Sequence, residues 1–211
     1  ADKLVALRTR TVDTVVRDAW QRCVPEGDAL ALFAVGGYGR GELFPQSDID
    51  LLVVAEPDVQ QQAQPALARF VALLWDAGLQ ASPAVRSATE CTEAAADQTV
   101  LTALIEARPL LAWEEEAAQL RAAVGPDRVW SPRAFLDAKV AEQRQRHARF
   151  GDTSDNLEPN IKDGPGGLRD LHMLGWLALR SFGVRDLEAL VGLGHLGPDE
   201  AIALERERRV L

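Results

Sequence analysis

The sequence predicts an α+β fold: a small mixed sheet with helices on one face, followed by an all-helical domain. In the first 112 residues, short apolar runs of strand length alternate with segments of helical periodicity. From residue 113 onward, only helical periods and one long loop occur. We therefore expect two domains, residues 1–112 with the sheet and residues 113–211 without one.

The first half of the sheet domain contains two buried strands. Apolar residues recur at helical spacing over residues 4–20, which predicts an opening helix. The continuous apolar runs 29–35 and 49–54 have the length of strands, and the first ends at Gly36-Gly37. Between them, residues 38–44 are long enough for one or two helical turns.

The second half adds a helix, an edge strand and another helix. Helical spacing over residues 60–76 predicts a helix that ends before Gly78. Residues 79–86 form a third strand, which Pro83 weakens because proline cannot donate to a sheet ladder. Thr89 is a suitable N-cap for a helix that runs to about residue 107.

The remaining chain is predicted to be helical. A helix follows residues 114–116, another covers 133–150, and a loop rich in Gly, Asp, Asn and Pro covers 151–167. Further helices cover residues 168–182 and 198–211. Five tryptophans in apolar helical contexts are expected to anchor the core: Trp20, Trp75, Trp113, Trp130 and Trp176.

Composition restricts the class of protein. With 47% hydrophobic and 26% charged residues, the chain resembles an average globular protein. No apolar run approaches the ~20 residues that span a bilayer, so we expect no membrane segment. Its net charge of −9 disfavours nucleic acid as a partner, because affinity for phosphate backbones comes from clustered Lys and Arg. Only Cys23 and Cys91 are present, which suits free thiols in a reducing cytoplasm.

One segment carries recognisable chemistry, from Gly36 to Asp50. A buried strand ends in Gly36-Gly37, and a short helix begins there, so free N–H groups can bind an anion. Asp48 and Asp50 stand two residues apart at the start of the next strand, which places them on one face. Two carboxylates beside a phosphate cradle suit Mg²⁺ bridging protein and triphosphate.

Other phosphate and metal motifs do not fit this segment. The glycines do not give G-x-G-x-x-G, because position 42 is Glu, and no Gly-Lys-Ser/Thr of a P-loop follows. The pair Asp48-Ile-Asp50 does not continue into a calcium loop. A lone Asp-x-Asp has little specificity; the ordered combination with Gly-Gly and Ser47 has much more.

The combination resembles the nucleotidyltransferase signature of the DNA polymerase β superfamily. The longer string Gly-Gly-Tyr-Gly-Arg-Gly-Glu-Leu-Phe-Pro-Gln-Ser-Asp-Ile-Asp is similar to that of bacterial PII uridylyltransferases. A second block supports this: Asn156-Leu-Glu158-Pro-Asn-Ile-Lys162, then Gly-Pro-Gly-Gly-Leu-Arg169-Asp170. Upstream, Glu142-Gln143-x-x-Arg146-His147 also matches that family.

The resemblance implies transfer of UMP from UTP to a tyrosine of the signalling protein PII, with release of pyrophosphate. It assigns two Mg²⁺ or Mn²⁺ ions to Asp48 and Asp50, and phosphate contacts to Gly36 and Gly37. Ser47 either binds a phosphate or metal-shell oxygen or caps the loop locally. Arg40 either reaches the triphosphate or is a solvated helix residue.

In the second block, a glycine-rich loop lies between Lys162 and Arg169. Facing an acidic metal site in the cleft between the domains, these cations would clamp the β- and γ-phosphates. Alternatively, Arg169 and Asp170 form a structural ion pair at the start of a helix.

The third carboxylate that many members of the superfamily supply from a neighbouring strand is missing from residues 79–86. Asp97 or Glu106 could replace it, although a structural role suits each better. A general base is not identified.

Two rival functions remain open: a different nucleotidyltransferase, such as the adenylyltransferase of glutamine synthetase, and an inactive nucleotide-binding module. The chain lacks an initiator Met and ends within a helical period, so we expect a piece of a longer protein. Members of the family carry HD hydrolase and ACT domains further on, and we expect this chain to lack their de-uridylylation and glutamine sensing.

Overall fold

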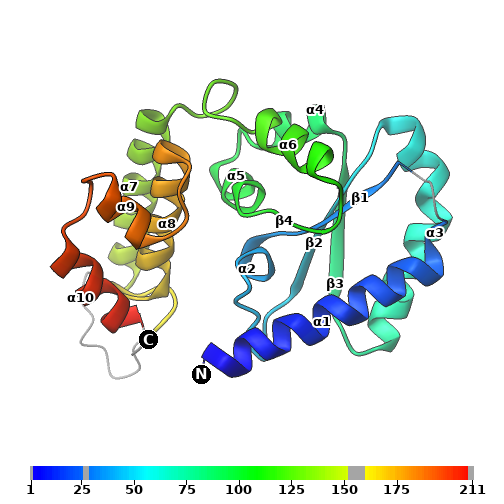
Figure 1. Cartoon of the computed structure of the whole chain (residues 1–211), viewed down its shortest axis with the longest axis horizontal. Coiled ribbons are helices and arrows are strands. Elements are labelled where there is room, and N and C mark those ends of the chain that lie inside the picture. Colours follow the sequence, from blue (N-terminus) through cyan, green and yellow to red (C-terminus); the bar gives the residue numbers. More distant parts are fainter. Residues whose placement is uncertain (1, 26–28, 152–159, 209–211) are drawn as a thin grey trace. The chain divides into compact units, whose positions relative to one another are not determined.

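The computed structural model describes residues 2–25, 29–151 and 160–208. Asn156 and Glu158 of the second motif therefore lie outside the described residues. The chain divides into two compact units, Ala1–Val129 and Trp130–Leu211, and Figure 1 labels the elements of each. This division comes later than the boundary at residue 112 that the sequence suggested. The reason is that helix α6 (Glu114–Ala123) packs against α4 (Ala88–Ala94) of the first unit.

The first unit contains a mixed sheet with the strand order β3-β2-β1-β4. Its strands are β1 (Ala31–Ala34), β2 (Ile49–Val54), β3 (Ala81–Arg86) and β4 (Arg108–Leu111). Strand β1 is antiparallel to β2 and β4, whereas β2 and β3 are parallel. The α+β class with a small mixed sheet is confirmed.

Prolines occur in both edge strands of this sheet. Pro83 lies in β3, and Pro109 lies in β4, a strand that the sequence did not predict. An edge strand tolerates proline because its missing N–H can point away from the ladder. Strand β4 has four residues, one of which is Pro109, so it is too short to show a strand pattern in the sequence.

Helices α1 (Asp2–Cys23) and α3 (Pro57–Asp76) cover one face of the sheet and pack against each other (Figure 1). Their apolar residues form a single core with alternate residues of β1 and β2. Trp20 of α1 and Phe70 of α3 meet edge to face, with ring centroids 5.1 Å apart. Burial of this face fixes the register of β2 and therefore the direction in which its polar residues point.

The opposite face is also covered over part of its length. Phe33 and Leu52, which are register partners, point away from the α1–α3 core, and each is only 1% exposed. Burial of residues on this second face was not part of the expectation of a sheet with helices on one face. Asp50 lies on this second face at the start of β2, and it is exposed.

The helix predicted from Thr89 to residue 107 is in fact two helices. Helix α4 begins after Ser87, whose hydroxyl accepts from the Glu90 N–H in a capping box. Helix α5 (Gln98–Ile105) begins after Asp97, whose carboxylate accepts from the Thr99 N–H at 2.7 Å. Asp97 therefore has a structural role as a helix cap.

The described elements of the second unit are all helices: α7 (Pro132–Arg149), α8 (Leu168–Phe182), α9 (Leu187–Gly192) and α10 (Pro198–Arg208). Helix α9 was not predicted. Among the helices described in both units, none is both long and apolar enough to cross a membrane.

Two of the tryptophans expected in the core are exposed. Trp20 and Trp176 are buried, but Trp75 and Trp113 are 62% and 81% exposed. The Trp75 indole N–H donates to the Ala81 carbonyl, so it lies along the edge strand β3.

Cys91 is buried and Cys23 is partly exposed, and both are free thiols. Burial raises the pKa of Cys91 to about 11.

Candidate active site

The glycine turn and the second aspartate of the motif are in contact. Helix α2 (Gly36–Gly39) is a single turn that follows β1 directly. Gly36 has φ +58°, and a Cβ at this position would lie 3.1 Å from Oδ2 of Asp50. The Val35 N–H donates to the Asp50 carbonyl at 3.1 Å, which ties the end of β1 to the start of β2. The structure therefore brings the predicted phosphate cradle to the predicted metal ligand.

Gly39 is the last residue of the same turn, and there is no room for a side chain at this position. A Cβ there would lie 2.6 Å from the Glu106 carbonyl oxygen and 3.0 Å from that of Ala34. The turn is therefore wedged between β1 and the end of α5. This close approach explains the third glycine of the motif, which the sequence alone did not.

Arg40 folds back over the turn. Its Nε lies 2.8 Å from Oε2 of Glu42, and its Nη1 lies 2.7 Å from Oε2 of Glu106. Its Nη2 lies 3.7 Å from the position of a Cβ on Gly37. The guanidinium is thus held beside Gly37 by two carboxylates, and Glu106, at 4% exposed, is engaged in this ion pair.

Ser47 and Asp48 line a small polar hollow next to the first residues of β2. Its volume is about 180 Å³, and its walls also include Arg8, Gln46 and Gln80. The Ser47 N–H donates to the Phe44 carbonyl at 2.9 Å, so this residue also closes a local turn. Asp48 is exposed.

The donor set of this site fits a divalent cation that also binds substrate phosphate. Among the residues that the structure describes, no group of three or more His, Cys, Asp or Glu side chains gathers to hold a metal. Asp48 and Asp50 are both exposed carboxylates, and a side chain in place of Gly36 would crowd Oδ2 of Asp50. Mg²⁺ is commonly held by one or two carboxylates plus phosphate oxygens.

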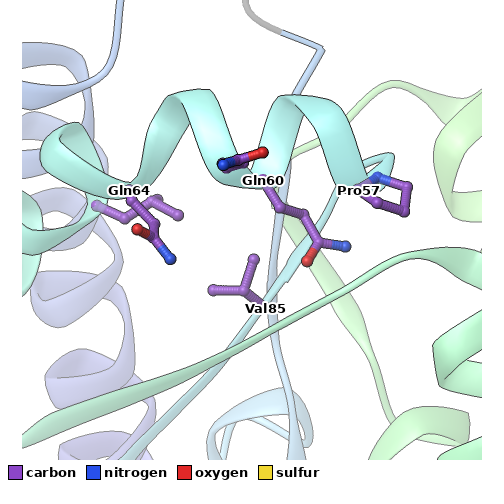
Figure 2. A pocket seen from close by; sticks show the side chains of 6 residues that line it. Pro57, Gln60, Gln64 and Val85 are labelled. Atoms are coloured by element: carbon purple, nitrogen blue, oxygen red, sulfur yellow. The ribbon is translucent and has the colours of Figure 1, made fainter.

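A larger hollow lies elsewhere, between α3 and β3. Figure 2 shows Gln60 and Gln64 projecting from α3 toward Val85 of β3. Its volume is about 460 Å³, and its lining residues are all neutral: Pro57, Gln60, Gln61, Gln64, Leu67 and Val85. Without a charged group it cannot stabilise a triphosphate, so we do not place the site there.

Helix α1 holds the loop between α2 and β2 at two points. The buried Thr9 hydroxyl donates to the Gly41 carbonyl at 2.9 Å. Arg8 Nη2 donates to the Pro45 carbonyl at 3.2 Å. Sequence reasoning missed both contacts, because the partners lie more than 30 residues apart and the helix pattern shows only the apolar face of α1.

A third connection fixes α2 itself. Arg108 of β4 forms a bidentate pair with Asp13 of α1, at 2.9 and 3.0 Å, and its Nη2 donates to the Tyr38 carbonyl at 3.3 Å. The guanidinium lies 5.4 Å from the centroid of the Tyr38 ring. Burial, and next the nearby Asp13 carboxylate, raise the pKa of Tyr38, so its hydroxyl stays protonated.

We expect Asp13→Asn to lower the free energy of unfolding by about 2 kcal/mol, because it leaves a partly buried guanidinium without its carboxylate. Urea unfolding followed by tryptophan fluorescence measures this. Asp18→Asn, an exposed position on the same helix, should change it by less than about 0.5 kcal/mol. Equal effects for the two variants would show that the pair does not hold α2.

In the second unit, Asp170 joins the glycine-rich loop to α7. Its carboxylate accepts from Arg146 Nη2 at 2.7 Å, from Gln143 Nε2 at 2.9 Å and from the Gly166 N–H at 2.8 Å. His147 Nε2 lies 3.0 Å away. The sequence block containing Gln143, Arg146 and His147 therefore folds onto the block containing Asp170.

Lys162, in this loop, lies next to Arg169, which is the second residue of α8. The Arg169 N–H donates to the Lys162 carbonyl at 2.9 Å. Lys162 is exposed. Arg169 Nε lies 3.4 Å from Asp163, and the guanidinium lies 5.7 Å from the Trp176 ring centroid. The structure pairs Arg169 with Asp163, whereas Asp170 forms an ion pair with Arg146 and lies beside His147.

The Asp170 network predicts a pH-dependent stability. Burial alone would raise the pKa of Asp170, but hydrogen bonds from Gln143, Arg146 and the Gly166 N–H bring it below the usual value. A lowered carboxyl pKa stabilises the folded state at neutral pH, and this contribution is lost as the pH falls through the folded-state pKa.

We therefore expect Asp170→Asn to destabilise the chain by about 2 kcal/mol at pH 7, and by progressively less as the pH falls through the lowered pKa of wild-type Asp170. Urea unfolding at pH 7 and at a series of acidic pH values measures the difference. Asp137→Asn is the control, because its pair with Arg133 is exposed and should contribute less than about 0.5 kcal/mol. A penalty for Asp170→Asn that is unchanged in acid would contradict this role.

Comparison with known proteins identifies both units. The nucleotidyltransferase domain family matches residues 12–127, and the family described as GlnD PII-uridylyltransferase matches residues 134–211. A bifunctional uridylyltransferase/uridylyl-removing enzyme of Xanthomonas campestris is 65% identical over 210 residues. The enzyme of the same name from Methylococcus capsulatus is 42% identical over 210 residues.

These alignments cover 100% and 99% of the chain, but only 24% of each relative, so the chain spans about a quarter of their length. The first unit contains the glycine turn and the paired aspartates within the matched range. Since that match extends over more than half of its residues, the chain belongs to the nucleotidyltransferase domain family.

Proposed function

We propose that this chain transfers UMP from UTP to a tyrosine hydroxyl of the PII signalling protein. The observation that supports the reaction type is the closeness of Gly36 to Asp50, since a Cβ on Gly36 would lie 3.1 Å from Oδ2 of Asp50, so that a glycine turn suited to anions lies beside a carboxylate. Support for uridylyl transfer to PII comes from the relatives, which are named uridylyltransferases, and from the PII-uridylyltransferase family match.

In this proposal, Asp48 and Asp50 hold Mg²⁺ or Mn²⁺ together with phosphate oxygens of UTP. When bound, such a cation stabilises negative charge on the attacking and leaving oxygens. The N–H groups at Gly36 and Gly37 bind the phosphates, and Arg40, which Glu42 and Glu106 hold beside Gly37, donates hydrogen bonds to them through its Nη2. Ser47 orients the loop that carries Asp48 through its turn to Phe44.

The tyrosine oxygen attacks the α-phosphorus of UTP, a new P–O bond forms, and the bond to pyrophosphate breaks. Pyrophosphate leaves with the bonding electrons, and the phenolic proton passes to solvent. We assign Lys162 and Arg169 to phosphate binding as a further part of the proposal. Both are cations, and the hydrogen bond from the Arg169 N–H to the Lys162 carbonyl brings them together where the glycine-rich loop begins and ends.

Incubation of the chain with UTP labelled at the α-phosphate, Mg²⁺ and PII tests this function. We expect label on PII and release of pyrophosphate, and much less label with ATP. Label on glutamine synthetase from ATP would favour an adenylyltransferase instead. Tight UTP binding without transfer would indicate a binding module.

A further inference from the structure

The polar hollow whose wall includes Ser47 and Asp48 also contains Arg8, Gln46 and Gln80, to which the proposed nucleotide site gives no role. It lies between helix α1, the loop that leads into β2 and the residues that precede β3. At about 180 Å³ it is smaller than the ~300–1,000 Å³ of sites for drug-sized ligands. It has room for a single side chain and not for a nucleoside triphosphate.

Its position in the sheet is opposite to the glycine turn. Strand β2 lies between β1 and β3. Gly36 follows β1, whereas Gln80 of the hollow precedes β3 and accepts the Ile49 N–H at its carbonyl, at 3.2 Å. Asp50, at the start of β2, therefore lies on the side of the phosphate turn, whereas Asp48, just before β2, lines the hollow. Ser82, the register partner of Asp50, is exposed on the β3 side.

The geometry of phosphoryl transfer suggests which substrate the hollow could bind. The attacking and leaving oxygens lie roughly in line, on opposite sides of the phosphorus. If the leaving pyrophosphate lies over Gly36, then the attacking hydroxyl must approach from the β3 side. The hollow lies on that side, beside the residues that precede β3, and Asp48 is part of its wall.

Its chemistry suits a polar side chain of a protein. The lining contains one cation, Arg8, and one anion, Asp48, together with the amides of Gln46 and Gln80. Arg8 Nε is buried and has no hydrogen-bond partner within the described part of the chain, while its Nη2 binds the Pro45 carbonyl. An unsatisfied buried N–H is a costly group that a ligand oxygen would satisfy.

We propose that this hollow receives the acceptor side chain, so that Arg8, Gln46 and Gln80 position the hydroxyl of the protein substrate opposite the leaving pyrophosphate. The inference rests on the proposed function, because it assigns the acceptor of that same reaction. It separates the chain's contacts into a nucleotide side at Gly36 and an acceptor side at Gln80.

Filling the hollow tests the proposal. Gln80 is exposed at its rim, so Gln80→Trp should occupy it without disturbing the core. We expect kcat/KM for PII to fall about 30-fold, the scale of losing one anchoring side chain. The KM for UTP, and the Kd for UTP with Mg²⁺ measured by calorimetry without PII, should stay within about twofold.

Gln62→Trp on α3 is the matched control, because Gln62 is exposed and lies outside the hollow; it should leave every parameter unchanged. Gln80→Ala, which leaves the hollow open, should lower kcat/KM for PII less than Gln80→Trp does. If Gln80→Trp fails to fold, Gln46→Trp fills the hollow from another wall.

Several results would overturn the proposal. If Gln80→Trp behaves like Gln62→Trp while the wild type transfers UMP, the hollow is not the acceptor site, although the proposed function stands. If Gln80→Trp weakens UTP binding as much as transfer, the hollow belongs to the nucleotide. If the wild-type chain labels no PII at all, the proposed function fails, and the acceptor site fails with it.

Discussion

Replacing Asp50 or Asp48 with asparagine should reduce UMP transfer by about 10³-fold or more. Each substitution removes a negative charge from a site proposed to hold a divalent cation, whose stabilisation of transition-state charge amounts to several kcal/mol, and each 1.36 kcal/mol is tenfold in rate. The fold should be unaffected, because both side chains are exposed. Release of pyrophosphate from UTP in the presence of PII measures the loss.

Asp76→Asn provides the control for this experiment. Asp76 is an exposed aspartate at the end of α3, so its substitution tests the effect of removing a surface charge alone. We expect transfer by this variant to match the wild type. Activity of Asp50→Asn within a few-fold of that of Asp76→Asn would remove Asp50 from the mechanism.

Gly39→Ala should have the largest effect on stability, lowering the free energy of unfolding by about 3 kcal/mol. The new methyl group would meet two backbone oxygens, of Glu106 at 2.6 Å and of Ala34 at 3.0 Å, and neither can rotate away. Relief of the clash requires movement of α2 away from β1, so UTP binding should weaken as well.

Gly175→Ala tests whether these effects come from crowding. Gly175 lies within helix α8, and a Cβ there would meet nothing within 4 Å. Alanine is favoured over glycine in a helix by roughly 0.5–1 kcal/mol, so this variant should be slightly more stable. Urea unfolding of both variants, with calorimetry of UTP binding, checks the pair of expectations. Equal stability of Gly39→Ala and the wild type would show that the turn is not wedged.

The local parts of this fold could be predicted from the sequence. The apolar runs that became β1 and β2 stop at glycine or proline, and their burial on both faces leaves a continuous apolar pattern. The contact of Gly36 with Asp50 follows from the same pattern, because the end of one strand lies beside the start of its antiparallel neighbour.

Other local features were ambiguous in the sequence. Ser87 and Thr89 are both good N-caps, and only the structure shows that the helix begins after Ser87. Likewise, the periodicity around Trp75 and Trp113 indicates a helix but does not say which side chains other elements cover. A tryptophan in an apolar helix is therefore weak evidence for burial.

Long-range polar contacts could not be predicted from any pattern in the sequence. Asp13 and Arg108 are 95 positions apart, and only the pairing of β4 with β1 brings Arg108 to α1. Similarly, Arg40 and Glu106 meet across 66 positions, which gave Glu106 an ionic role that its sequence context did not show. Such contacts depend on the whole packing of the unit.

The central claim is that Asp48, Asp50 and the Gly36–Gly37 turn form one site for a divalent cation and a nucleoside triphosphate. Electron paramagnetic resonance of Mn²⁺, titrated with the chain in the presence and absence of UTP, tests it most directly, because it does not depend on turnover. We predict that UTP strongly increases Mn²⁺ binding by the wild type and that Asp50→Asn abolishes this increase. Binding of Mn²⁺ with UTP that is equally tight in wild type and Asp50→Asn would contradict the claim.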